Sequence, residues 1–236
     1  MLISTRDIQV ILSKKIILNQ ISYQFYQGKI YGIIGPNGAG KSTYLKVISG
    51  FTKPTSGKIY FQGKQLHAPN RNIAVVWQKP YLFQTSVYHN IAYGLKIRGM
   101  KRESIKKKVA GILELFQIKH LEDQKAESLS GGEAAKVAIA RAVVTSPDLL
   151  ILDEPTASLD PKSVLDIEKI IADLKVRFNM TIIIVTHNMF QAKRLADETL
   201  FFDSGELIEV QSTEGLFDNP LHPMTMKFIS GESFYG

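Results

Sequence analysis

The sequence predicts an α/β fold with a mostly parallel sheet, an N-terminal antiparallel β subdomain and a helical subdomain. Short apolar runs of strand length alternate with stretches of helical periodicity along most of the chain. Two of these runs, residues 149–152 and 182–185, are apolar throughout, which is typical of strands buried on both faces of a parallel sheet. Residues 86–141 have a helical pattern that interrupts the alternation, and they predict the helical subdomain.

The first elements lead into a glycine-rich loop. Residues 21–25 alternate between apolar and polar side chains, which predicts a strand, and Gly28 marks the turn after it. Residues 30–34 predict a short apolar strand that ends at the loop. Residues 43–48 predict the helix after the loop, which Gly50 ends.

The elements after the loop are short strands and then helices. Residues 57–66 predict two short strands around Gly63, and residues 73–77 predict another strand. Within the helical stretch, five apolar residues share one face of a helix: Ile105, Val109, Ile112, Leu113 and Phe116. Residues 106–108, all lysine, lie on the other face, where we expect them to be solvated.

The composition is typical of an intracellular globular protein. Of the 236 residues, 44% are hydrophobic, which is enough for a sizeable core, and no apolar run is long enough to span a bilayer. The chain has no cysteine, and its first residues lack the features of a secretion signal. The net charge of +7 suits nucleic acid, anionic lipid or small anions. Since the basic residues are spread along the chain, an ordinary lysine-rich surface is the favoured explanation.

The glycine-rich loop matches the phosphate-binding motif G-x-x-x-x-G-K-[ST] in full. Its glycines let successive backbone N–H groups face phosphate oxygens, and the helix that follows adds the positive end of its dipole. Lys41 is expected to reach the β- and γ-phosphates, and the Ser42 hydroxyl is expected to bind Mg²⁺. The residues expected to bind the nucleotide here are Gly35, Pro36, Asn37, Gly38, Ala39, Gly40, Lys41, Ser42 and Thr43.

Further polar residues follow three other apolar runs. In open α/β sheets, ligands bind beyond the carboxyl ends of the strands. Asp153 is placed to hold Mg²⁺, and Glu154 is placed to accept a hydrogen bond from a water that attacks the γ-phosphate. Gln78 and His187 end two other runs, and taken alone each of them is more typical of a structural role.

A second motif narrows the class of protein. The segment Leu129-Ser130-Gly131-Gly132-Glu133 precedes a helical stretch and lies upstream of the acid pair, and Ser158-Leu159-Asp160 and His187 follow in that order. With the glycine-rich loop, these elements resemble the nucleotide-binding subunits of ABC transporters over nearly the whole chain. The resemblance implies a P-loop NTPase core that binds ATP and Mg²⁺.

The resemblance also implies how these residues work. Two copies would close head to tail around two ATP molecules, so that residues 130–132 of one contact the γ-phosphate held by the other. Glu154 would act as the general base or orient the water, and His187 would stabilise the transferring phosphate. Gln78 would contact Mg²⁺ or the water and report the nucleotide state to a membrane partner. Asp160 would lie at the seam of the homodimer.

Three positions depart from the family's pattern. The signature ends in Glu133 where glutamine is usual, and this carboxylate can still accept a bond from a ribose hydroxyl. Lys136 replaces the usual arginine, so bidentate bonding is lost. The family usually stacks adenine on an aromatic residue, but Leu12 falls at that position, so aliphatic contact and loose base selectivity are expected. Tyr23 is an alternative stacking residue, although its place in an alternating strand favours core packing.

The resemblance further implies an importer. The segment before the signature, residues 123–128, does not match the glutamate-rich segment of exporters, and no membrane domain is fused to the chain. The partners expected are separate transmembrane permease subunits and an extracytoplasmic solute-binding protein, with no nucleic acid. The permease is expected to dock through residues between Tyr81 and Arg98, although core packing is an equally good explanation of each: Tyr81, Leu82, Phe83, Tyr88, Ile91, Tyr93 and Arg98. The stretch 82–99 is similar to importers of tungstate, molybdate and phosphate, so an oxyanion such as tungstate or molybdate is the expected cargo.

The predicted organisation is one ABC ATPase domain over residues 1–236, peripheral on the cytoplasmic side of the cell membrane. Residues 1–80 and 146–211 would form the RecA-like core and β subdomain, and residues 81–145 the helical subdomain. Residues 212–236 would form a short helical tail. Two alternatives stay open at this point: a non-transport relative that acts on nucleic acid or ribosomes, and a scaffold that binds nucleotide without hydrolysing it.

Overall fold

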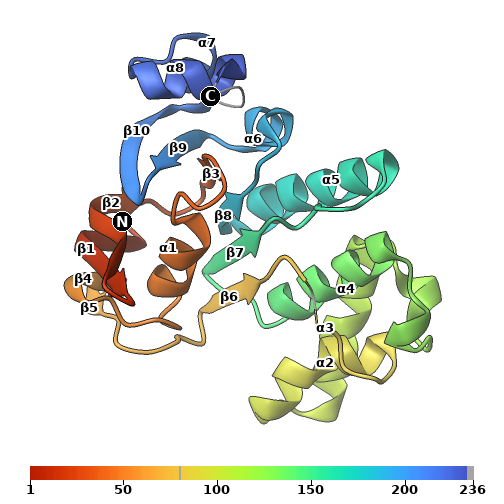
Figure 1. Cartoon of the computed structure of the whole chain (residues 1–236). Coiled ribbons are helices and arrows are strands. Elements are labelled where there is room, and N and C mark those ends of the chain that lie inside the picture. The colour runs from red at the N-terminus through yellow and green to blue at the C-terminus, as the bar shows by residue number, and fades with distance from the viewer. Residues whose placement is uncertain (80, 233–236) are drawn as a thin grey trace.

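The computed structural model of the chain describes residues 1–79 and 81–232 and confirms the predicted α/β class (Figure 1). The last four residues of the expected helical tail, 233–236, lie outside the described residues. Within the described part of the chain, no helix is both long and apolar enough to cross a membrane.

A four-stranded antiparallel sheet forms the N-terminal β subdomain. Its strand order is β2-β1-β4-β5, with bounds β1 (Ile3–Leu12), β2 (Lys15–Phe25), β4 (Ser56–Phe61) and β5 (Lys64–Gln65). Ser13 and Lys14 both have positive φ, at 48° and 66°, as the two central residues of a tight hairpin turn require. This turn carries no glycine signal, so the sequence pattern identified the strand only from residue 21.

A six-stranded sheet forms the centre of the molecule, and all of its pairings except β9–β10 are parallel. Its strand order is β10-β9-β3-β8-β7-β6, with bounds β3 (Ile30–Ile34), β6 (Ile73–Val76), β7 (Leu149–Asp153), β8 (Thr181–Val185), β9 (Glu198–Asp203) and β10 (Glu206–Ser212). Every residue of β7 and β8 is buried, as their continuous apolar runs predicted. Alternate residues enter different cores: Leu150 packs with the helical subdomain, and Ile151 packs with α1 and the antiparallel sheet.

The helices cover both faces of the central sheet and build the separate helical lobe (Figure 1). Their bounds are α1 (Lys41–Ile48), α2 (Val87–Ile97), α3 (Arg102–Leu115), α4 (Gly131–Val143), α5 (Pro161–Phe178), α6 (Met189–Leu195), α7 (Thr213–Asp218) and α8 (Pro223–Ser230), with 3-10 turns η1 (Lys119–Leu121) and η2 (Ala126–Ser128). The apolar face of α3 is buried, and residues 106–108 are exposed, which confirms the expected solvated lysine face.

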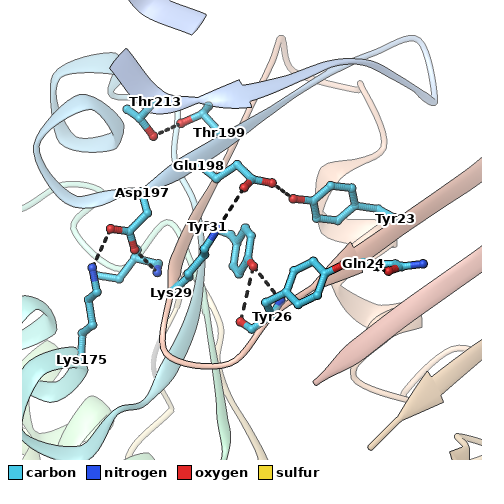
Figure 2. A network of polar contacts seen from close by, with 11 residues as sticks. Tyr23, Gln24, Tyr26, Lys29, Tyr31, Lys175, Asp197, Glu198, Thr199 and Thr213 are labelled. Atoms are coloured by element: carbon cyan, nitrogen blue, oxygen red, sulfur yellow. Dashed lines mark hydrogen bonds and ion pairs between the residues drawn. The ribbon is translucent and has the colours of Figure 1, made fainter. Parts of the chain in front are cut away.

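Polar contacts join the two sheets where β2 passes β3 and β9 (Figure 2). The Tyr23 hydroxyl donates to the Glu198 carboxylate, and Lys29 Nζ lies 3.4 Å from the same carboxylate. Burial raises the pKa of the Glu198 carboxyl. Tyr23 therefore packs in the structure as its alternating strand predicted, with its ring against Phe25 at 4.6 Å, and it does not face the glycine-rich loop.

Replacing Tyr23 with phenylalanine tests this junction. Tyr23→Phe leaves the half-buried Glu198 carboxylate without its hydroxyl donor, so we expect the free energy of unfolding to fall by about 1–2 kcal/mol at pH 7. Tyr26→Phe is the matched control, because the Tyr26 hydroxyl is exposed and contacts only Gln24, at 3.1 Å, in the described structure. Urea titration measures both variants. An equal loss in the two would contradict a specific role for the Tyr23–Glu198 bond.

Candidate nucleotide-binding site

The glycine-rich loop connects β3 to α1 in a conformation that two of its glycines make possible. Gly35 has φ 144°, and a Cβ there would lie 2.0 Å from the Phe202 carbonyl oxygen. Gly40 has φ 93°, and a Cβ there would lie 2.7 Å from Leu18 Cδ2. No side chain caps the start of α1. The N-terminal N–H groups of this helix therefore suit an anion.

Lys41 lies beneath this loop. Its Nζ donates to the carbonyl oxygens of Gly35 at 2.7 Å and Pro36 at 2.8 Å. Burial lowers the pKa of the Lys41 ammonium, and the nearby Glu154 and Asp153 oppose that effect. The positive charge is thus already directed into the loop where a phosphate would enter.

The acid pair lies at the carboxyl end of β7, as predicted. Asp153 is 7% exposed, and burial raises the pKa of its carboxyl. The Ser42 hydroxyl lies 3.4 Å from Asp153 Oδ1, which is long for a hydrogen bond between two oxygens. Ser42 Oγ and Asp153 Oδ1 are therefore spaced as two oxygen ligands of one hard cation could be. Mg²⁺ is such a cation, and it takes its remaining ligands from water and phosphate.

Glu154 is the point where the other candidate residues meet. Its Oε2 accepts a hydrogen bond from Gln78 Nε2 at 2.9 Å and lies 3.2 Å from His187 Nδ1. Its backbone is left-handed, with φ 48°, which is uncommon for a residue other than glycine and is typical of functional sites. Gln78 and His187, weak signals in the sequence, therefore lie within contact distance of the predicted catalytic carboxylate.

A cavity of about 800 Å³ opens over these groups. Its lining residues are Ile17, Gly35, Pro36, Asn37, Gly38, Ala39, Gly40, Lys41, Ser42, Thr43, Gln78, Glu154, His187 and Phe228. The set includes every residue of the predicted loop. Leu12 is not among these lining residues, and its side chain is 52% exposed at the end of β1.

Ile17 and Phe228 line the cavity although the sequence did not indicate them. Ile17 reaches it because β2 passes the loop so closely that a Cβ on Gly40 would lie 2.9 Å from the Ile17 carbonyl oxygen. Phe228 reaches it because the Glu209 carboxylate holds the tail, accepting from the backbone N–H groups of Leu221 at 2.8 Å and His222 at 3.0 Å. Both depend on contacts between distant segments, which hydrophobic periodicity does not predict.

The signature segment lies elsewhere, at the start of α4. Ser130 is the N-cap, and Glu133 completes a capping box by accepting from the Ser130 backbone N–H at 2.8 Å and hydroxyl at 2.7 Å. None of the residues 130–133 lines the cavity over the glycine-rich loop. Asp160 likewise caps α5, accepting from Ser163 N at 3.0 Å. Lys136, the departure from arginine, pairs with Asp166 at 2.7 Å.

A glycine-rich loop with its lysine at the end of β3, and an acid pair at the end of β7 two strands away, define a P-loop nucleotide-binding protein. The family description "ABC transporter" matches residues 18–157, and the chain belongs to this family. It is an ATPase of that class, with ATP as its nucleotide.

Three similar proteins agree with this assignment. The tungstate uptake system ATP-binding protein TupC of Peptoclostridium acidaminophilum is 45% identical, covering 82% of this chain and 90% of that protein. The phosphate import ATP-binding protein PstB 1 of Enterococcus faecalis is 37% identical, covering 98% of both. Among solved structures, cbiO1 of Clostridium perfringens, part of the ABC transporter complex cbiONQ, has a TM-score of 0.86 at 31% identity, covering 92% of this chain and 91% of that one.

The capping box predicts a pH dependence of stability. The hydrogen bonds from the Ser130 hydroxyl and backbone hold the pKa of the Glu133 carboxyl below its ordinary value of 4.5. A lowered folded-state pKa contributes stability that is present above the unfolded pKa and is lost as the pH falls through the folded pKa. Glu133→Gln should therefore lower the free energy of unfolding by a few tenths of a kcal/mol at neutral pH and by less at about pH 3.

Urea titration at the two pH values measures this difference. Glu127→Gln, at an exposed carboxylate nearby, is the control and should show no such change. A Glu133→Gln effect of the same size at both pH values would contradict a role for the carboxylate charge.

Proposed function

We propose that this protein is the ATP-hydrolysing subunit of an ABC importer that takes up a small oxyanion. Hydrolysis is supported by the contacts that Gln78 and His187 both make with the Glu154 carboxylate. All three residues line the cavity over the glycine-rich loop. The importer part is supported by the relatives named for tungstate uptake and phosphate import.

The glycine-rich loop would bind the phosphates of ATP. Lys41 Nζ would exchange its two carbonyl partners for β- and γ-phosphate oxygens, and the N–H groups at the start of α1 would complete the cradle. Ser42 and Asp153, with Gln78 nearby, would hold Mg²⁺. When bound, this ion supplies positive charge that offsets the charge of the phosphate oxygens.

Glu154 would act on the attacking water. Its Oε2 is fixed by Gln78 and His187, so it is oriented to accept a proton from a water that approaches the γ-phosphate. The His187 side chain is 63% exposed, and it can turn to donate to the transferring phosphate. Since Gln78 contacts Glu154 directly, it is placed to sense whether nucleotide is present.

The site would be completed by a second copy of the chain. Ser130, Gly131 and Gly132 stand at a helix start away from the cavity of their own chain, where their N–H groups can face an anion held by another copy. Glu133 would stand beside the ribose of that nucleotide, and Asp160 would lie at the seam. In such a dimer the Ser130 hydroxyl would donate to the γ-phosphate in place of Glu133.

Separate permease subunits would hold this protein at the cytoplasmic side of the membrane, with an extracytoplasmic solute-binding protein delivering cargo. Tyr81, Phe83 and Tyr93 are exposed, at 86%, 40% and 46%, and they form an apolar surface that suits a protein partner. Ile91 is fully buried, so its expected place in the docking surface is wrong, because its side chain packs in the core of the helical lobe. Arg98 is exposed, and its guanidinium donates to the carbonyl oxygens of Thr145 at 3.1 Å and Arg71 at 2.5 Å.

The relatives support an oxyanion as cargo, because two anions of similar shape are named among them. Nucleic acid is not favoured as a partner, and the formal charge of +7 needs no such ligand to explain it.

Replacing Glu154 tests the hydrolytic role. We expect Glu154→Gln to slow ATP hydrolysis by about 100-fold or more, because an amide cannot accept the proton. ATP should still bind, and the variant should elute as an ATP-dependent dimer on size-exclusion chromatography. Glu103→Gln, at an exposed carboxylate on α3, is the control and should hydrolyse ATP normally. Unchanged turnover in Glu154→Gln would remove Glu154 from this role.

The aliphatic side chain of Ile17 in the cavity lining leads to a prediction about nucleobase selectivity. Because the position expected for stacking is Leu12, and Phe228 in the cavity lining is only 4% exposed, we expect GTP to compete with ATP within about tenfold in affinity. Ile17→Ala should weaken ATP binding by about 5- to 30-fold, since it removes apolar contact, and Leu12→Ala should leave binding nearly unchanged. Equilibrium binding of a fluorescent ATP analogue, with ATP and GTP as competitors, measures all three. A larger loss in Leu12→Ala than in Ile17→Ala would instead support the position expected from the sequence.

A further inference from the structure

A second cavity, of about 780 Å³, lies at the end of the central strands opposite to the nucleotide site. It is lined by Asp148, which directly precedes β7, and by Met180, which directly precedes β8. Because the glycine-rich loop and Glu154 lie at the carboxyl ends of the parallel strands, this cavity lies at their amino ends. Its volume is in the range of sites that hold small organic ligands.

The interior of this cavity is apolar and the rim is cationic. Helix α3 contributes one wall, and α5 with the residues after it contributes another. The apolar side chains of the lining are Met100, Ile112, Leu115, Val143, Val144, Pro147, Leu174, Phe178 and Met180. Three exposed cations, Lys107, Lys108 and Arg177, stand among the described lining residues. Lys108 Nζ lies 3.5 Å from Ser146 Oγ, and Arg177 lies 3.8 Å from Asp173.

Among the described residues of the lining, a single acidic side chain accompanies these three cations. Asp148 is the one carboxylate among the described residues that line the cavity, and its Oδ2 already accepts from Gln62 at 2.9 Å and Asn72 at 2.8 Å. Because the three cations outnumber Asp148 and Asp173, the partner of Arg177, the rim has a net positive charge next to an apolar interior, and an anion with an apolar body matches both.

Gly111 keeps this space open. It lies in the interior of α3, where glycine is unfavourable relative to alanine, and its φ is not in the left-handed region. A Cβ built at Gly111 would meet nothing within 4 Å. Neither backbone conformation nor close packing therefore requires this glycine, and the consequence of its missing side chain is free volume at the cavity wall.

We propose that this cavity is a binding site for a small amphipathic anion, of the class of a medium-chain carboxylate. Its apolar body lies between α3 and α5, and its head group lies against Lys107, Lys108 and Arg177. The occupant touches both the helical lobe, through α3, and the central sheet, through the residues before β7 and β8. Its binding is therefore sensitive to the relative position of the two.

Calorimetric titration of the whole chain with decanoate, below its micelle-forming concentration, tests the site. We expect saturable binding of one decanoate per chain, and binding of decanol at least about tenfold weaker, since the alcohol lacks the charge that the rim recognises. Decanol binding as tightly as decanoate, or an absence of saturable decanoate binding, overturns the proposal.

Two sets of variants locate the bound anion. Gly111→Leu places a branched apolar side chain at the cavity wall and should weaken decanoate binding by about tenfold or more, whereas Gly111→Ala, which adds only one methyl group, should retain it. Both variants should melt at or above the temperature of the unmodified chain. The exposed triple change Lys107→Gln, Lys108→Gln and Arg177→Gln leaves the interior intact and should weaken decanoate by about tenfold or more without affecting decanol. Unaltered decanoate affinity in both Gly111→Leu and the triple variant overturns this location.

Discussion

The parallel pairing of β7 with β8 is the constraint on which the rest of the site depends. Its register places Asp153 opposite Val185, and the next backbone N–H, that of Glu154, donates to the Val185 carbonyl oxygen at 2.9 Å. A shift of one residue would turn every side chain to the other face of the sheet. It would also move Glu154 away from His187, which follows β8. The left-handed backbone of Glu154 is held in place by this bond and by the buried strand before it.

The same sheet explains which of the candidate residues lie together within one chain. The carboxyl ends of β3, β7 and β8 gather the glycine-rich loop, the acid pair and His187, because parallel strands end at one edge. Ser130 stands instead at the start of α4, and its hydroxyl is engaged by Glu133. If this hydroxyl serves a phosphate on a second copy, the capping bond must be exchanged for it. With glutamate in place of glutamine, the Ser130 hydroxyl leaves a carboxylate and not a neutral amide, so closure begins from a stronger bond.

The parts of the fold that the sequence predicted are those set by local pattern. The runs that became β7 and β8, the loop between β3 and α1, and the apolar face of α3 all follow from periodicity or from a motif whose residues are adjacent in the chain. Leu12 is expected at the adenine by alignment and stays a prediction; in the structure it is 52% exposed before the hairpin turn at Ser13 and Lys14, whereas Ile17, after that turn, lines the cavity. The place of Phe228 in the cavity lining depends on the hydrogen bonds by which Glu209 holds a tail more than ten residues away in the chain. The burial of Ile91 depends on how three helices pack. No pattern within a short window contains those contacts.

Helix α5 runs from the end of the central sheet near the nucleotide site to the end where the second cavity lies. It begins at Asp160, expected at the seam with a second copy, and ends at Arg177 and Phe178, which line the cavity at the amino ends of the strands. Its 18 residues form a rigid rod of about 27 Å, and its buried face is fixed in the core by Ile167, Ile171 and Leu174. If closure at the expected seam tilts this helix, the distance between its last turn and α3 would change as well. The anion proposed for the cavity would contact both, so any difference in its affinity for the two tilts would, by linkage, favour or oppose closure on ATP by the same free energy.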